Sequence, residues 1–117
     1  MKITLKNEAI DWFENKFPLD KGEAVRFFGK TYGSTEVHDG FSVGMQMDSI
    51  DNHDEILALA EVNDRQYFTT QQDEWFFEGY DLEIQIDDRY NEPYYHFIDQ
   101  QNPEKSADSV SSASKKA

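Results

Sequence analysis

The sequence predicts an α+β domain in which one N-terminal helix is followed by a run of strands in a mixed or mostly antiparallel sheet. Apolar residues recur with helical spacing near the N-terminus, and from Ala24 onward the chain changes to short segments rich in β-branched and aromatic residues. The length of 117 residues is enough for one hydrophobic core. The nine phenylalanines, six tyrosines and two tryptophans all lie at or before Phe97. We therefore expect a single domain over residues 1–98 and a disordered polar tail over residues 99–117.

The predicted helix spans residues 7–17 and follows a brief strand at Ile3–Leu5. Asn7 is the expected N-cap, and the helix ends before Pro18, which cannot continue it. A turn is expected at Leu19–Glu23. The side chains predicted to face the core follow the i, i+3, i+7 spacing of one helix face: Ile10, Phe13 and Phe17.

The first long strand is predicted at Ala24–Thr31, and a polar loop bounded by glycines is expected at residues 32–40. Ile56–Val62 and Arg65–Thr70 are predicted to form a hairpin, because the Asn63–Asp64 pair between them is typical of a tight turn. A helix over Ile56–Val62 is the alternative, since leucine and alanine favour helices. The remaining predicted elements are a period-two strand at Phe41–Asp48, a helical turn at Gln71–Gly79, and strands at Leu82–Ile86 and Tyr94–Ile98.

The chain carries a formal net charge of −13. A surface this negative repels phosphate groups, so nucleic acid and anionic membranes are not expected as partners. The charge can simply maintain solubility, or it can form an acidic face for a basic protein or a cation. The sequence also lacks the run of about 20 apolar residues that a membrane span needs, and it begins with no secretory signal. We therefore expect a cytoplasmic protein.

No arrangement of residues in the sequence predicts catalysis. The chain contains no cysteine, and its three histidines are not placed beside a recognisable nucleophile motif. Ser34 and His38 share one polar loop, which leaves a small hydrolase as the least favoured hypothesis. The acidic segment Asp48–Glu55 lacks the spacing and the glycine of an EF-hand, so we interpret it as a solvated turn. The aromatic residues of Trp75–Phe77 and Tyr90–Phe97 can form an interface, although packing in the core is the simpler interpretation.

Four stretches in a fixed order resemble the HesB/IscA-like family of iron-sulfur cluster biosynthesis proteins, particularly its small branch in low-GC Gram-positive bacteria. The resemblance covers residues 1 to about 98. The four stretches are the opening Ile3–Leu5 with a helix containing Ala9, the strand Val25–Phe28 leading to Gly33, the segment Gly40–Gly44, and Trp75–Phe76 through Asp81. The resemblance implies a β-rich pseudobarrel with a leading helix.

Members of this family hold iron or an iron-sulfur cluster on thiolates, supplied by a cysteine in the loop after the first long strand and by a C-terminal Cys-Gly-Cys pair. The resemblance places the loop cysteine at Ser34, and the C-terminal pair after Phe97, where this chain has Ile98, Asp99 and Gln100. A neutral serine oxygen is a poor replacement for a soft thiolate. Iron or an iron-sulfur cluster is therefore implied only by the family, and no cofactor is expected in this chain.

Two functional hypotheses follow. The first is a non-enzymatic, HesB-like protein that binds an unidentified partner protein, with a homodimer as a further candidate assembly. The second is a weak binder of ferrous or another divalent ion through His38, Asp39 and neighbouring carboxylates, which are hard enough ligands to hold such an ion.

Overall fold

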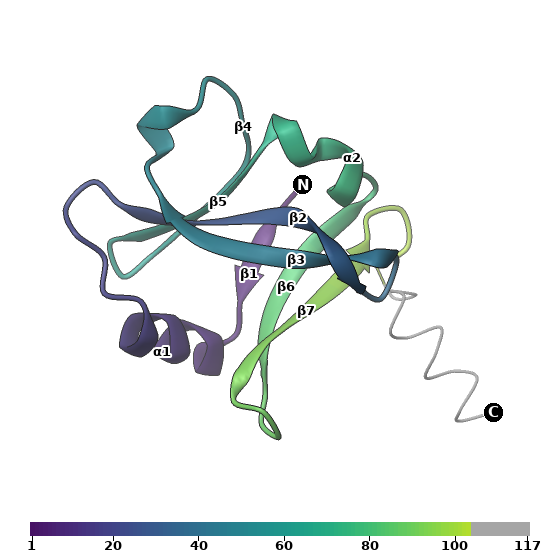
Figure 1. The fold of residues 1–117 in the computed structure, drawn as a ribbon, viewed down its shortest axis with the longest axis horizontal. Helices are drawn as coiled ribbons and strands as arrows, with labels where there is room; N and C mark the ends of the chain where they lie inside the picture. Colours follow the sequence, from purple (N-terminus) through teal and green to yellow (C-terminus); the bar gives the residue numbers. More distant parts are fainter. Residues whose placement is uncertain (104–117) are drawn as a thin grey trace.

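The computed structural model describes residues 1–103, which fold into two α-helices and seven strands arranged in two sheets (Figure 1). The strands β2 and β3 form a long hairpin across the molecule, and β6 and β7 run at a steep angle to it (Figure 1). In chain order the elements are β1 (Ile3–Leu5), α1 (Asn7–Lys16), β2 (Ala24–Ser34), β3 (Asp39–Asp48), the 3-10 turn η1 (Ile50–Asn52), β4 (Ile56–Val62), β5 (Arg65–Thr70), the 3-10 turn η2 (Gln71–Asp73), α2 (Glu74–Phe77), β6 (Tyr80–Asp87) and β7 (Glu92–Asp99).

Both sheets are mixed, so the predicted α+β class is confirmed. In the three-stranded sheet, with order β1-β6-β7, β1 runs parallel to β6 and β7 runs antiparallel to it. In the four-stranded sheet, with order β3-β2-β5-β4, β2 pairs antiparallel with β3 and parallel with β5. Within residues 1–103 the strands remain two sheets and do not close into one barrel.

The helix α1 packs against β6 and buries Ala9 and Phe13 completely. It begins one residue earlier than the predicted cap requires, because Lys6 occupies the N-cap position and Asn7 is already helical. The prediction of an Asn7 cap was therefore wrong. The physical reason is that the Lys6 backbone N–H donates to the Ile84 carbonyl oxygen at 2.9 Å, so strand pairing with β6 fixes where the chain turns into the helix.

The predicted loop at residues 32–40 is shorter in the structure, because β2 continues to Ser34 and β3 begins at Asp39. A bulge between Thr31 and Ser34 makes this possible. Tyr32 and Gly33 both have a positive φ, of 90° and 84°, and they absorb the bulge so that Ser34 pairs with Asp39 beyond it. A positive φ is rare for tyrosine, which is why the sequence did not indicate it.

Residues 56–62 form a strand rather than a helix, since they pair along their length with β5. The predicted hairpin turn is confirmed, and Asn63 and Asp64 both adopt positive φ values, of 54° and 65°. The strand β7 ends at Asp99, one residue beyond the predicted domain boundary, and residues 104–117 of the predicted tail lie outside the described part of the chain. Among residues 1–103 no helix is long and apolar enough to cross a membrane.

One aromatic core lies between the two sheets and α1. Phe27 of β2 contacts Phe13 of the helix edge to face, and it also contacts Tyr95 of β7. The core is therefore shared by both sheets, in agreement with the single core predicted from chain length. Its fully buried large side chains are Phe13, Val25, Phe27, Tyr67, Phe76, Phe77, Leu82, Ile84 and Phe97.

Candidate functional site

The loop at residues 35–38, which joins β2 to β3, is tied to β7 by one carboxylate. The side chain of Glu36 is 10% exposed and accepts a hydrogen bond from the backbone N–H of Phe97 at 2.9 Å. The Tyr94 hydroxyl donates to the same carboxylate, and Nδ1 of His96 lies 3.2 Å from both of its oxygens. Glu36, Tyr94, His96 and the Phe97 N–H form what we call the Glu36 cluster. Because the cluster joins residues about 60 positions apart, it holds the loop against the three-stranded sheet.

The other end of this loop is held by His38. Its Nε2 lies 2.7 Å from the Phe76 carbonyl oxygen, and its ring stacks on the Phe76 ring with 4.9 Å between centroids. Within the loop, the Thr35 hydroxyl accepts hydrogen bonds from the backbone N–H groups of Val37 and His38. The loop is thus fixed from inside and at both ends, to β7 through Glu36 and to α2 through His38.

The structure pairs two of the three residues that the sequence singled out and holds the third against α2. Ser34 and Asp39 lie opposite each other at the end of the β2–β3 ladder, and both are exposed. His38 instead faces Phe76. No Ser34–His38 hydrogen bond occurs in residues 1–103, so the geometry gives the hydrolase hypothesis no activated nucleophile. In the same part of the chain, no three His, Asp or Glu side chains are grouped closely enough to hold a metal ion.

A groove runs between β3 and the beginning of β7, beside the Glu36 cluster. Two adjoining cavities of about 520 and 540 Å³ form it, and they share the residues Ser42, Val43, Glu92, Pro93 and Tyr95. Tyr95 also spans the groove, since its hydroxyl lies 3.5 Å from the Met45 sulfur. Burial raises the pKa of the Tyr95 phenol, and the nearby charge of Glu92 raises it further. The phenol is therefore neutral and contributes shape rather than charge to the β3–β7 groove.

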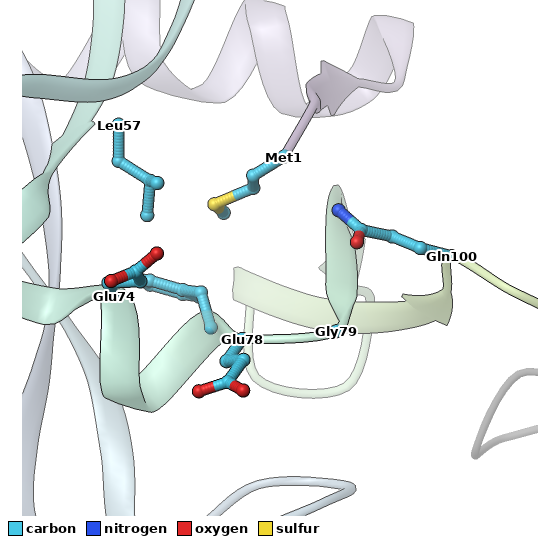
Figure 2. A pocket seen from close by; sticks show the side chains of 7 residues that line it. Met1, Leu57, Glu74, Glu78, Gly79 and Gln100 are labelled. Atoms are coloured by element: carbon cyan, nitrogen blue, oxygen red, sulfur yellow. The ribbon is translucent and has the colours of Figure 1, made fainter.

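A second, smaller pocket of about 190 Å³ shares no lining residue with the β3–β7 groove. Figure 2 shows Met1 and Leu57 on one side of it and Glu74 and Glu78 on the other, with Gln100 near its rim. The two carboxylates and the few other polar groups form no arrangement of an acid, a base and a nucleophile.

The sequence did not reveal the Glu36 cluster. It indicated that Tyr94–Phe97 is rich in aromatic residues, but it gave no reason to connect that segment with residue 36. The cluster exists because the β2–β3 hairpin crosses β7, and hairpin crossing depends on the order of strands in both sheets. Nothing in the sequence distinguished Glu36 from an exposed glutamate, because burial cannot be read from so short a polar segment.

The chain is similar to known proteins over most of its length. It is 29% identical over 97 residues to the pyruvate dehydrogenase inhibitor of Bacillus subtilis, covering 83% of this chain and 99% of that protein. An uncharacterized protein of Staphylococcus saprophyticus is 29% identical over 103 residues, covering 81% of this chain and 97% of that protein. Among solved structures, Escherichia coli SufA, which is involved in biosynthesis of iron-sulfur clusters, matches with a TM-score of 0.46 and 21% identity, covering 84% of this chain and 80% of SufA. No protein-family model matches the sequence.

Proposed function

We propose that this chain is a non-enzymatic protein that acts by binding a pyruvate dehydrogenase component and lowering its activity. The observation that carries the proposal is the closed loop at residues 35–38, which the chain's own Glu36 ties to β7 and which contains no thiol. The loop offers rigid surface rather than reactive groups. The near full-length similarity to the B. subtilis pyruvate dehydrogenase inhibitor supports the choice of partner.

We further propose that the chain descends from HesB-like proteins and has lost their chemistry. By the sequence resemblance, Ser34 stands where the family has its loop thiolate, and Ile98–Gln100 stand where it has the C-terminal pair. Between these two positions the chain places the carboxylate of Glu36. A hard carboxylate that already accepts several hydrogen bonds is a poor ligand for an iron-sulfur cluster, which is held by soft thiolates.

The first test adds the purified full-length chain to the pyruvate dehydrogenase complex of the organism that encodes it. We expect saturable inhibition of NADH formation, and direct binding that weakens as salt is added, because the chain is strongly acidic. An unrelated acidic protein of similar net charge serves as the control for charge alone. Absence of both binding and inhibition, or equal inhibition by the control protein, would overturn the choice of partner.

A second test addresses metal and cluster binding. Anaerobic reconstitution with iron and sulfide is expected to leave the purified protein without the visible absorption of a cluster. Calorimetry with ferrous ion is expected to give no saturable heat that depends on His38, when the native chain is compared with the His38→Ala variant. Heat that disappears in His38→Ala would instead support the divalent-metal hypothesis at His38 and Asp39.

A further inference from the structure

The outer edge of β3 presents a row of backbone groups that are not used by the sheet. The Gly29 N–H of β2 donates to Oδ1 of Asp73 at 3.3 Å, so it points away from its partner Val43 on β3. Hydrogen-bonded and non-hydrogen-bonded pairs alternate along an antiparallel ladder. The backbone groups of every second residue of β3 therefore point outward, away from β2: Phe41, Val43, Met45 and Met47.

The edge of β7 is protected in a way that the edge of β3 is not. The outward N–H of Phe97 is occupied by Glu36, and Pro93, on the same side of the strand, has no N–H to offer. Covering an edge with a loop and placing a proline on it are two devices by which proteins prevent strand addition at an edge. The outermost strands β1 and β4 of the two sheets contact each other.

The strand β3 carries neither device. Between Asp39 and Asp48 its sequence, GFSVGMQM, contains no proline and no charged residue. A strand of 10 residues with an open, uncharged edge is what natural proteins avoid unless the edge is used for pairing. In Figure 1, β3 borders the four-stranded sheet along the length of the hairpin.

We propose that the edge of β3 is a strand-addition site, which takes an extended, lysine- or arginine-bearing segment of the partner protein into the β3–β7 groove. This inference rests on the proposed function, since it states how a partner is held. Main-chain hydrogen bonds to an edge strand supply affinity in this mode of recognition, and alternate side chains supply specificity. The groove offers the aromatic and apolar surfaces of Trp12, Pro93 and Tyr95 to the aliphatic stems of basic side chains.

Charge selects a basic occupant. The chain has a formal net charge of −13, and exposed carboxylates stand at the beginning of both strands, Asp39 on β3 and Glu92 on β7. Lys30 is the one basic side chain in the lining of the groove within residues 1–103. A second copy of the chain would bring the same excess negative charge to the interface, which opposes self-pairing through this edge.

The test uses amide hydrogen exchange measured by NMR on the full chain, with two blocked synthetic peptides of equal length. One alternates valine with lysine and the other alternates valine with glutamate. We expect the lysine peptide to slow exchange of the outward Val43 and Met45 amides about tenfold, because they gain hydrogen bonds. The inward amides of Ser42 and Gly44 are internal controls, since β2 already protects them. The proposal would be overturned if the lysine peptide slowed no outward amide selectively, or if the glutamate peptide had an equal effect. It would also be overturned if Val43 became protected without peptide as the protein concentration rose, since that result would show a homodimer.

Two variants at one position separate backbone from side chain. Val43→Pro removes an outward N–H without breaking a ladder hydrogen bond, whereas Val43→Ala removes side-chain atoms and keeps the N–H. We expect Val43→Pro to weaken binding of the lysine peptide at least about tenfold, and Val43→Ala to change that binding little. If Val43→Pro does not fold, the exchange experiment on the native chain remains decisive. Equal binding by both variants would overturn the strand-addition site. Failure of the proposed function is distinguishable, because it would leave pyruvate dehydrogenase uninhibited by the native chain while the peptide result stands.

Discussion

Removing the carboxylate of Glu36 should destabilise the fold by about 3 kcal/mol, which can be worked out from its partners. The Phe97 residue is fully buried, so its N–H would lose its acceptor without gaining water, at a cost of about 1–3 kcal/mol. The Tyr94 hydroxyl lies nearer the solvent, since Tyr94 is 38% exposed, and it recovers part of its hydrogen bonding from water, whereas the His96 side chain is only 14% exposed. Together these losses give about 3 kcal/mol for Glu36→Ala, because hydrogen bonds to a charged group exceed neutral ones.

The assay is urea unfolding followed by tryptophan fluorescence, with thermal unfolding as a second measurement. For a domain of about 100 residues, a loss of about 3 kcal/mol lowers Tm by roughly 12 °C. Glu36→Gln keeps a carbonyl oxygen that can accept from the Phe97 N–H but loses the charge, and it should cost about half as much. Glu61→Ala, at an exposed position of β4, is the matched control and should lie within about 0.5 kcal/mol of the native chain. A Glu36→Ala variant as stable as Glu61→Ala would refute the role assigned to the cluster.

Three further changes test other parts of the fold. In Gly29→Ala the new Cβ would lie 2.7 Å from Cγ of Phe76, so the ring must move. We expect the unfolding free energy measured in urea to fall by about 1–3 kcal/mol, and an unchanged midpoint would contradict this packing. Arg65 donates to two carbonyl oxygens at the end of α1, at 2.7 and 3.2 Å. Arg65→Met should therefore lower the unfolding free energy by about 1–2 kcal/mol in the same assay. An unchanged free energy would show that water replaces the guanidinium. Burial alone would raise the pKa of Asp48, but hydrogen bonds, first among them that from His53, outweigh it and lower the pKa from 3.8 to about 2. Since the unfolded state then binds more protons, this contribution to stability is complete above pH about 4 and is lost as the pH falls toward 2. Asp48→Asn should therefore flatten the slope of unfolding free energy against pH over that range, measured by urea unfolding.

The parts of the fold that the sequence predicted are those that local chemistry decides. The Asn63–Asp64 turn was predicted because both residue types tolerate a positive φ, and the structure has both there. The helix face at Phe13 followed from spacing alone, and this residue is fully buried. The end of β2 was missed because a positive φ at Tyr32 has no local signature in the sequence.

The parts that could not be predicted depend on contacts between distant residues. The parallel pairing of β2 with β5 joins the hairpin to the rest of its sheet, and no turn or motif specifies it. The candidate site shows the same limit. Ser34, His38 and Asp39 were chosen because they share one loop, yet the residue that organises the loop is Glu36, through partners on β7. The chemical reactivity of individual side chains was therefore a weaker guide to the site than the crossing of the β2–β3 hairpin over β7, which the sequence does not show.

The Glu36 cluster and the β3 edge are parts of one structural unit. By accepting from the Phe97 N–H, Glu36 closes the edge of β7, and in the same contact it fixes the loop from which β3 begins at Asp39. The Glu36 carboxylate therefore blocks strand addition at the edge of β7 and positions the edge of β3. A thiolate site at this loop would need its ligands free to reach a cluster, whereas a binding edge needs the loop held still, because a preordered strand loses less entropy when a partner adds to it. The half-buried carboxylate of Glu36 meets that second requirement. Loosening the loop in Glu36→Ala should therefore weaken peptide binding at β3, even though Glu36 makes no hydrogen bond with the added strand.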